Sequence, residues 1–251
     1  IDFETINHNI HSGALDALII TAASYEKKES VSFFTTSTGV ENWKKVGRSG
    51  KKSEINVQHL MASVALPLIF PAITIDEQYY GDGAMRQETP LSPAIRLGAE
   101  NLLIISTESP KVDARKSSDK NYPDFPEIGG YILDGLFSGS LYSDLERLDR
   151  INQVIAQNQN QKVQTETKEM KYIDYLVISP SVDLTEIATN CYKDIPLSLR
   201  MLFKGIGIEK DTNSELLSFL LFESSFTKSL IDLGFHDAIE RKEEIKNFLK
   251  I

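Results

Sequence analysis

The sequence is poor in cysteine. Cys191 is the one cysteine among 251 residues, so an internal disulfide and a zinc site built from several cysteines are both excluded. We expect Cys191 to be a small, partly buried apolar residue. A reducing intracellular compartment is the simplest setting for such a chain, and an exported protein without disulfides is the alternative.

Long uncharged runs are also rare. The longest stretch without Asp, Glu, Lys or Arg covers residues 55–75, where Pro67 and Pro71 would interrupt a membrane-spanning helix. The chain begins at Ile1 rather than Met, and its opening residues have neither the basic nor the apolar part of a signal peptide. We therefore expect a cytoplasmic protein without transmembrane helices, and we interpret Ile1 as an internal point of a longer chain.

Positive charge is in deficit. Lysine and arginine total 27 against 36 aspartate and glutamate residues, which gives a formal net charge of −9. Nucleic-acid binding as the main function is disfavoured, because it requires clustered positive charge. One local basic patch runs from Trp43 to Lys52. A solvated loop is the favoured interpretation of this patch, and a peripheral lipid-binding surface is the alternative.

The apolar pattern of the first third predicts strands around one short helix. Residues 17–22 and 31–35 are rich in β-forming residues and predict a hairpin. A second hairpin is expected from residues 72–75 and 78–80, with its turn at Asp76 and Glu77. Residues 55–64 between the two hairpins have helical character.

The rest of the chain predicts an α/β protein that ends in helices. A helix over residues 90–97 precedes an apolar strand over 101–106, and residues 172–178 form a second apolar strand. Further helices are expected over 130–160, 195–204, 214–221 and from 226 to the C-terminus, with loops over 110–126 and 157–167.

Four motifs follow one another closely along the chain. They are HLMASVALPLIFP (59–71), YYGDGAM (79–85), TPLSPAIRLGA (89–99) and NLLIIST (101–107). Taken alone, an aspartate between two glycines, such as Asp82, is most often a turn residue. Taken together, in this order and spacing, the four motifs resemble the patatin-like phospholipases. The resemblance covers most of the chain, is strongest over residues 58–106, and suggests a bacterial branch of that family.

The resemblance implies a fold and a division of the chain. The fold would be a three-layer α/β sandwich with a mainly parallel central sheet, followed by C-terminal helices. Residues 1–180 would be the C-terminal portion of the catalytic domain, and residues 181–251 a helical extension that packs on it.

The resemblance also implies a reaction. The family uses a Ser–Asp dyad to hydrolyse phospholipids or other carboxylic esters through an acyl-enzyme. Asp82 would be the general base, within a motif formed by Asp82, Gly83 and Ala84. A carboxylate beside a serine hydroxyl can take its proton during attack on an ester carbonyl. No metal or organic cofactor is implied, and contact with membrane lipid would be peripheral.

The four histidines do not supply a catalytic triad. His8, His11, His59 and His236 all lie outside the catalytic positions of the family. His59 begins a helix-like segment, where we expect it to pack in the core or to cap the helix.

The serine nucleophile of the dyad is missing from the sequence. No G-x-S-x-G elbow and no glycine-rich oxyanion loop occurs anywhere in the 251 residues. The favoured explanation is that a preceding part of the same protein supplies both elements. The alternative is a catalytically silent module that binds lipid or protein.

Overall fold

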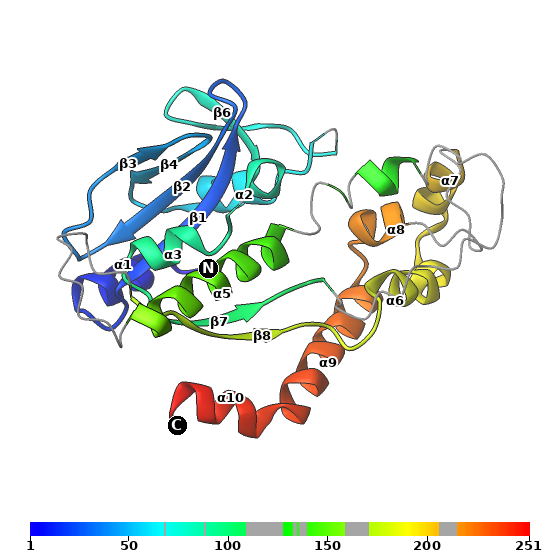
Figure 1. Cartoon of the computed structure of the whole chain (residues 1–251). Coiled ribbons are helices and arrows are strands. Elements are labelled where there is room, and N and C mark those ends of the chain that lie inside the picture. The colour runs from blue at the N-terminus through cyan, green and yellow to red at the C-terminus, as the bar shows by residue number, and fades with distance from the viewer. Residues whose placement is uncertain are drawn as a thin grey trace. The chain divides into compact units, whose positions relative to one another are not determined.

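The computed structural model describes residues 1–67, 69–87, 89–108, 128–132, 135, 140–158, 171–205 and 215–251 (Figure 1). The chain divides into two compact units. Unit 1 consists of residues 1–100 and 139–173, and unit 2 consists of residues 101–138 and 174–251. The expected domain boundary at residue 180 stays a prediction, and most of the two expected loops, 110–126 and 157–167, lies outside the described residues.

Unit 1 contains a six-stranded sheet with the order β3-β4-β2-β1-β6-β5. The two predicted hairpins are present, one formed by β1 and β2 and the other by β5 and β6. The turn between β5 and β6 lies at Asp76 and Glu77, which have φ angles of 48° and 63°. The bounds of the strands are β1 Ala17–Ser24, β2 Glu29–Thr36, β3 Trp43–Lys45, β4 Arg48–Lys52, β5 Ile73–Ile75 and β6 Gln78–Asp82.

The sheet of unit 1 is mainly antiparallel, so the expected mainly parallel central sheet is not confirmed. Of its five strand pairs, only β2 with β4 is parallel. Three of the antiparallel pairs, β1–β2, β3–β4 and β5–β6, join strands that follow one another in the sequence, and a short connection between neighbours returns the chain antiparallel. The basic patch from Trp43 to Lys52, expected to be a loop, supplies β3 and β4.

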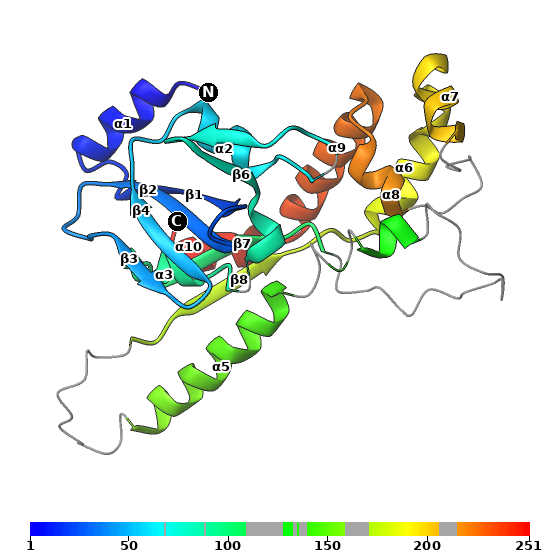
Figure 2. The ribbon, with the colours of Figure 1, turned by 90° about the horizontal axis from the view of Figure 1, so that it is seen from above.

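Helices flank this sheet, with α1 and α2 on one side and α5 on the other (Figure 2). The Asp2 carboxylate accepts from the Thr5 N–H at 3.0 Å and caps α1. Gly98, with a φ of 103°, follows the short helix α3 in the left-handed conformation that glycine favours. The bounds of the helices of unit 1 are α1 Phe3–His11, α2 Val57–Ser63, η1 Gly83–Arg86, α3 Ser92–Arg96 and α5 Ser140–Asn158.

A small aromatic core joins α2 to the sheet. Phe33 packs edge-on against Tyr80, with ring centroids 5.2 Å apart, and against His59 at 4.7 Å. All three side chains are buried, together with Ala22 and Ala62. This packing holds the strand that ends at Asp82 against the helix that precedes it in the sequence.

Two buried polar side chains attach α5 to the first stretch of unit 1 and to the residue before β8. The Asp144 carboxylate accepts from the Leu91 N–H at 3.1 Å, at the start of α3. The Asn152 amide donates to the Ile173 carbonyl at 2.8 Å and accepts from the Ile173 N–H at 3.1 Å. Leu145, Leu148 and Ile155 of α5 are buried, and all three belong to the periodic positions that predicted this helix.

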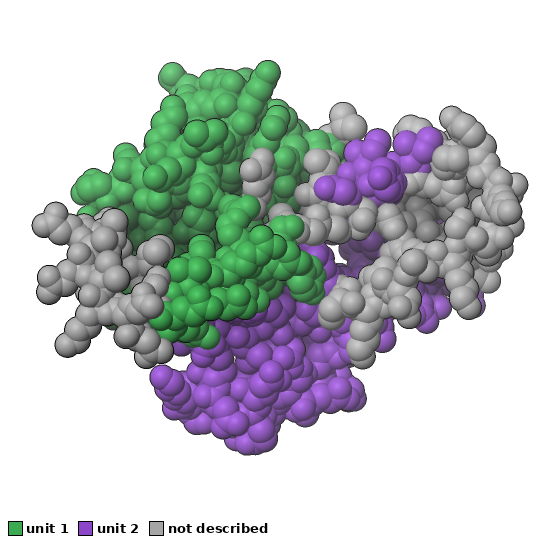
Figure 3. Space-filling model, in the orientation of Figure 1, with its two compact units in different colours: residues 1–100, 139–173 green, residues 101–138, 174–251 purple. Residues whose placement is uncertain are grey.

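Unit 2, purple in Figure 3, consists of a parallel strand pair and C-terminal helices. The strands β7 and β8 pair in parallel from Asn101 with Asp174 to Ile105 with Ile178. Cys191 lies buried in a helical core with Tyr192 and Phe203. Within the described ranges, no helix is long and apolar enough to cross a membrane. The elements of unit 2 are β7 Asn101–Ile105, β8 Asp174–Ile178, α6 Leu184–Cys191, η2 Tyr192–Asp194, α7 Leu197–Gly205, α8 Glu215–Leu220, α9 Ser224–Glu240 and α10 Lys242–Leu249.

Candidate functional site

Asp82 lies where β6 ends and η1 begins. Its backbone N–H donates to the Ala65 carbonyl at 2.9 Å, which connects the DGA motif to the segment after α2. One carboxylate oxygen, Oδ1, accepts from the Ala84 N–H at 2.9 Å and caps η1. The side chain is therefore held at a strand-to-helix junction, and no described residue donates a hydrogen bond to its second oxygen.

Both glycines beside Asp82 are in close contact with neighbouring chain. A Cβ on Gly83 would lie 2.4 Å from the backbone carbonyl oxygen of Thr21, on the adjacent strand β1. A Cβ on Gly81 would lie 2.6 Å from the Tyr25 hydroxyl. Gly83 is thus required by the close approach of the backbone, whatever the chemistry of the aspartate, whereas the atoms near Gly81 belong to the side chains of Tyr25 and Met85.

Burial raises the pKa of the Asp82 carboxyl group, because the charged form loses water, and the hydrogen bond from Ala84 partly opposes this effect. Among the residues that the structure describes, no serine, cysteine or histidine hydrogen-bonds to this carboxylate. A desolvated carboxylate with one uncommitted oxygen is chemically suited to accept a proton from a neighbouring hydroxyl. The role of Asp82 as a catalytic base stays a prediction at this point.

The first stretch of unit 1, from residue 3 to residue 95, matches the family model described as patatin-like phospholipase. The chain is patatin-like over these residues. The match contains the strand–turn–helix unit around Asp82 and ends within α3. No curated protein and no solved structure matches the chain.

His59, which the sequence predicted to be a packing or capping residue, also lies in the patatin-like segment. His59 is buried and forms a capping box with Asn56 at the start of α2. Desolvation lowers the pKa of His59, since burial disfavours the imidazolium form. His59 is therefore a neutral capping and packing residue of the patatin-like segment.

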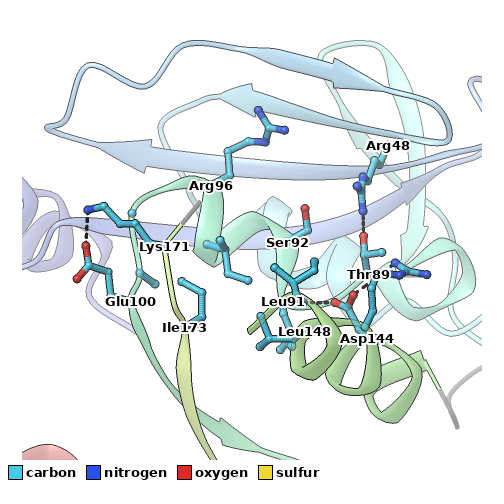
Figure 4. A pocket seen from close by; sticks show the side chains of 15 residues that line it. Arg48, Thr89, Leu91, Ser92, Arg96, Glu100, Asp144, Leu148, Lys171 and Ile173 are labelled. Carbon is cyan, nitrogen blue, oxygen red and sulfur yellow. Dashed lines mark hydrogen bonds and ion pairs between the residues drawn. The ribbon is translucent and has the colours of Figure 1, made fainter. Parts of the chain in front are cut away.

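An apolar cavity of about 650 Å³ lies within unit 1, between α3 and α5 (Figure 4). Its apolar wall includes Leu91, Leu148 and Ile173, all of which are buried. Lys171 and Glu100 form an ion pair at one end of it. Sequence reasoning missed this cavity, because α3 and α5 are separated by more than forty residues and nothing in their spacing relates them.

A smaller cavity of about 310 Å³ is also lined by residues of unit 1 and is polar. Three arginines line it: Arg48 of β4, Arg86 of η1 and Arg147 of α5. Ser30 and Ser32 of β2 add two hydroxyl groups. Elsewhere in the described chain, no three histidine, cysteine or acidic side chains gather in a way that could hold a metal ion.

Proposed function

We propose that this chain provides the general base of a serine-dependent lipid acyl hydrolase. The observation that supports this most strongly is the position of Asp82, which is half-buried and caps η1 at a strand-to-helix junction inside the patatin-like segment. Burial raises its proton affinity without removing the free oxygen that a base needs. The expected substrates are phospholipids or other carboxylic esters.

In the proposed reaction, the free oxygen of Asp82 takes the proton of a serine hydroxyl as that oxygen attacks the ester carbonyl. When the tetrahedral intermediate collapses, Asp82 returns this proton to the leaving alkoxide, which departs as the alcohol and leaves an acyl-serine. The ionised Asp82 next takes a proton from a water molecule, which attacks the acyl-serine. As the second intermediate collapses, Asp82 gives that proton to the serine oxygen and the carboxylic acid is released. The cap from Ala84 holds the carboxylate in one orientation through both steps.

The serine of this dyad would come from residues that precede Ile1 in the same protein. Two observations support a further segment. The sequence has no G-x-S-x-G, and β7 exposes Leu103 and Ile105 although its parallel pairing with β8 is of a kind that is normally buried. An additional layer packed on this face of β7 would cover these side chains.

Peripheral contact with lipid is a further part of the proposal. Val57, Met61 and Val64 are spaced along one face of α2 and are each about half exposed, and Phe70 after the helix is also exposed. An exposed apolar stripe of this kind suits shallow contact with a lipid surface.

The test uses the full-length protein with short-chain esters and phospholipids. Asp82→Asn should lower kcat by about 10²–10⁴, which is the usual contribution of a general base, because the amide cannot accept the serine proton. Asp76→Asn, the same change at an exposed turn, is the matched control and should leave kcat unchanged. Wild-type activity in Asp82→Asn would refute the proposal.

A second experiment separates the enzyme from the silent module. The 251-residue chain alone should not react with a serine-directed fluorophosphonate, whereas the full-length protein should be labelled once. If the full-length protein is neither labelled nor active, the silent lipid- or protein-binding module is the better description of this chain.

A further inference from the structure

The two cavities of unit 1 are adjacent. Arg48, Thr89 and Arg147 line both of them, so these three residues form a shared wall. The Arg48 guanidinium donates to the Thr89 hydroxyl within this wall. One cavity is predominantly apolar and the other carries arginines, which is the arrangement that an amphiphile requires.

The smaller cavity selects for negative charge. Its described lining contains three arginines and no carboxylate, in a chain with a formal net charge of −9. Arg147 is 3.6 Å from Asp144, but neither Arg48 nor Arg86 forms an ion pair with any described residue. Arginine binds phosphate through two parallel N–H donors, and the hydroxyls of Ser30 and Ser32 add further donors.

The larger cavity suits an acyl chain. Leu91, Leu148 and Ile173 lie on the opposite side of it from the polar ends of Arg48, Ser92 and Arg96 (Figure 4). Its volume of about 650 Å³ falls within the range of ordinary small-molecule sites. A single acyl chain that passes Arg48, Thr89 and Arg147 into this cavity would displace water from its apolar lining.

The arginine cavity is connected to the candidate base through η1, although Asp82 lines neither cavity. Arg86 is the last residue of η1, and Asp82 caps the first turn of the same helix. At a rise of about 2 Å per residue in a 3₁₀-helix, the two Cα atoms are about 8 Å apart. A bound phosphate near Arg86 would therefore lie one short helix away from Asp82.

We propose that the two cavities together bind a single-chain lipid with a phosphate head group, with the phosphate among Arg48, Arg86 and Arg147 and the acyl chain in the apolar cavity. This inference rests on the proposed function for its choice of a lipid ligand and extends it to a substrate class. It selects anionic lysophospholipids over neutral esters.

Binding can be measured through Trp43, the one tryptophan of the chain, which lines the arginine cavity. Its indole is packed on the backbone of Gly50 and under the Arg96 guanidinium, 4.8 Å from the ring centroid. The full-length protein and its Trp43→Phe variant are titrated with decanoyl lysophosphatidate below its micellar range, and the difference between their emissions gives the signal of Trp43. We expect a saturable change, and we expect decanoate, methyl decanoate and glycerol 3-phosphate each to bind at least about ten-fold more weakly.

Substitutions separate the two cavities. Arg86→Gln and Arg48→Gln should each weaken lysophosphatidate binding about ten-fold or more, because each removes charge-assisted hydrogen bonds to the phosphate. Lys45→Gln removes one charge from β3 outside both linings and should have no effect. Ile151→Phe, on the partly exposed wall of the apolar cavity, should weaken lysophosphatidate but not glycerol 3-phosphate.

The outcomes decide the proposal separately from catalysis. Equal affinity for phosphate-bearing and neutral amphiphiles, or unchanged affinity in Arg86→Gln, would overturn it. Glycerol 3-phosphate binding as tightly as lysophosphatidate would show a free-phosphate site and would also overturn it. The titrations are repeated in Asp82→Asn, in which binding is measured without consumption of the lipid, whereas binding without turnover in the wild-type protein counts against the proposed reaction alone. If Arg48→Gln lowers the Tm, the decision rests on the affinity of Arg86→Gln, because Arg86 is exposed and its substitution should leave the fold intact.

Discussion

The change from Gly83 to alanine tests whether the candidate site depends on the close approach of two backbones. The added Cβ would lie 2.4 Å from the Thr21 carbonyl oxygen and 3.0 Å from its carbon. Ordinary contact begins near 3.4 Å, so η1 and β1 would have to separate by about 1 Å. Gly83 does not have a positive φ, so the cost is steric and not conformational.

Overpacking of this kind costs about 1–3 kcal/mol, which corresponds to a fall in Tm of about 2–12 °C for a chain of this size. Thermal unfolding followed by circular dichroism measures it. Gly39→Ala is the matched control in the same unit, because a Cβ there meets nothing within 4 Å, and it should leave Tm unchanged or raise it slightly.

The obstructing atom belongs to the backbone, which makes the reasoning easy to refute. Thr21→Ala removes the side chain of the neighbour but leaves its carbonyl oxygen in place. The double variant Gly83→Ala/Thr21→Ala should therefore be no more stable than Gly83→Ala. Recovery of the wild-type Tm in the double variant, or a neutral Gly83→Ala, would show that the two backbones are not in the contact described.

Two further predictions concern buried polar groups. Burial raises the pKa of Asp82 above its ordinary value of 3.8, so the ionised carboxylate destabilises the folded state. Asp82→Asn should therefore have a higher Tm than the wild type at pH 7. The difference should vanish below pH 3.8, where Asp82 is protonated in both the folded and the unfolded wild type. A pH-independent difference in Tm would contradict this account. Asn152→Ala leaves two backbone groups of Ile173 without a partner and should lower the free energy of unfolding by about 1–3 kcal/mol for each, as measured by urea unfolding. Asn152→Asp should lower this free energy less, because the carboxylate still accepts from the Ile173 N–H. Equal losses in the two variants would argue against the paired hydrogen bonds.

Local patterns predicted the elements that local physics determines. The hairpin turn at Asp76 and Glu77, the apolar strands and the periodic apolar face of α5 all follow from residues close together in the sequence. The helix α6 was missed although Asp183, whose carboxylate accepts from the Thr185 N–H at 2.8 Å, is a usable cap signal. The strands β3 and β4 were missed because lysines and arginines conceal their pattern. The strand β4 pairs with β2 on one side and with β3 on the other. Gly50 of β4 has no side chain, which leaves room for the Trp43 ring of β3 on its backbone.

The functional site was predictable only in part. The DGA motif located Asp82, since its residues are consecutive and Gly83 is in close contact with the backbone of β1. The arginine cavity gave no such signal, because Arg48, Arg86 and Arg147 come from a strand, a 3₁₀-helix and a distant helix. The three arginines come together only when α5 packs against the first stretch of unit 1. The buried hydrogen bond from the Leu91 N–H to Asp144 is one contact that holds α5 there.

The discontinuity of unit 1 also sets an order of events during synthesis. The hairpin of β1 and β2 can pair as soon as it leaves the ribosome, but Leu91 must wait for Asp144, and Asn152 must wait for Ile173. Throughout that interval the apolar side chains that later face α5 are exposed to other nascent chains. A cell making this protein would therefore protect residues 1–100 longest, and a pause in translation before residue 173 would be the point of greatest risk of aggregation.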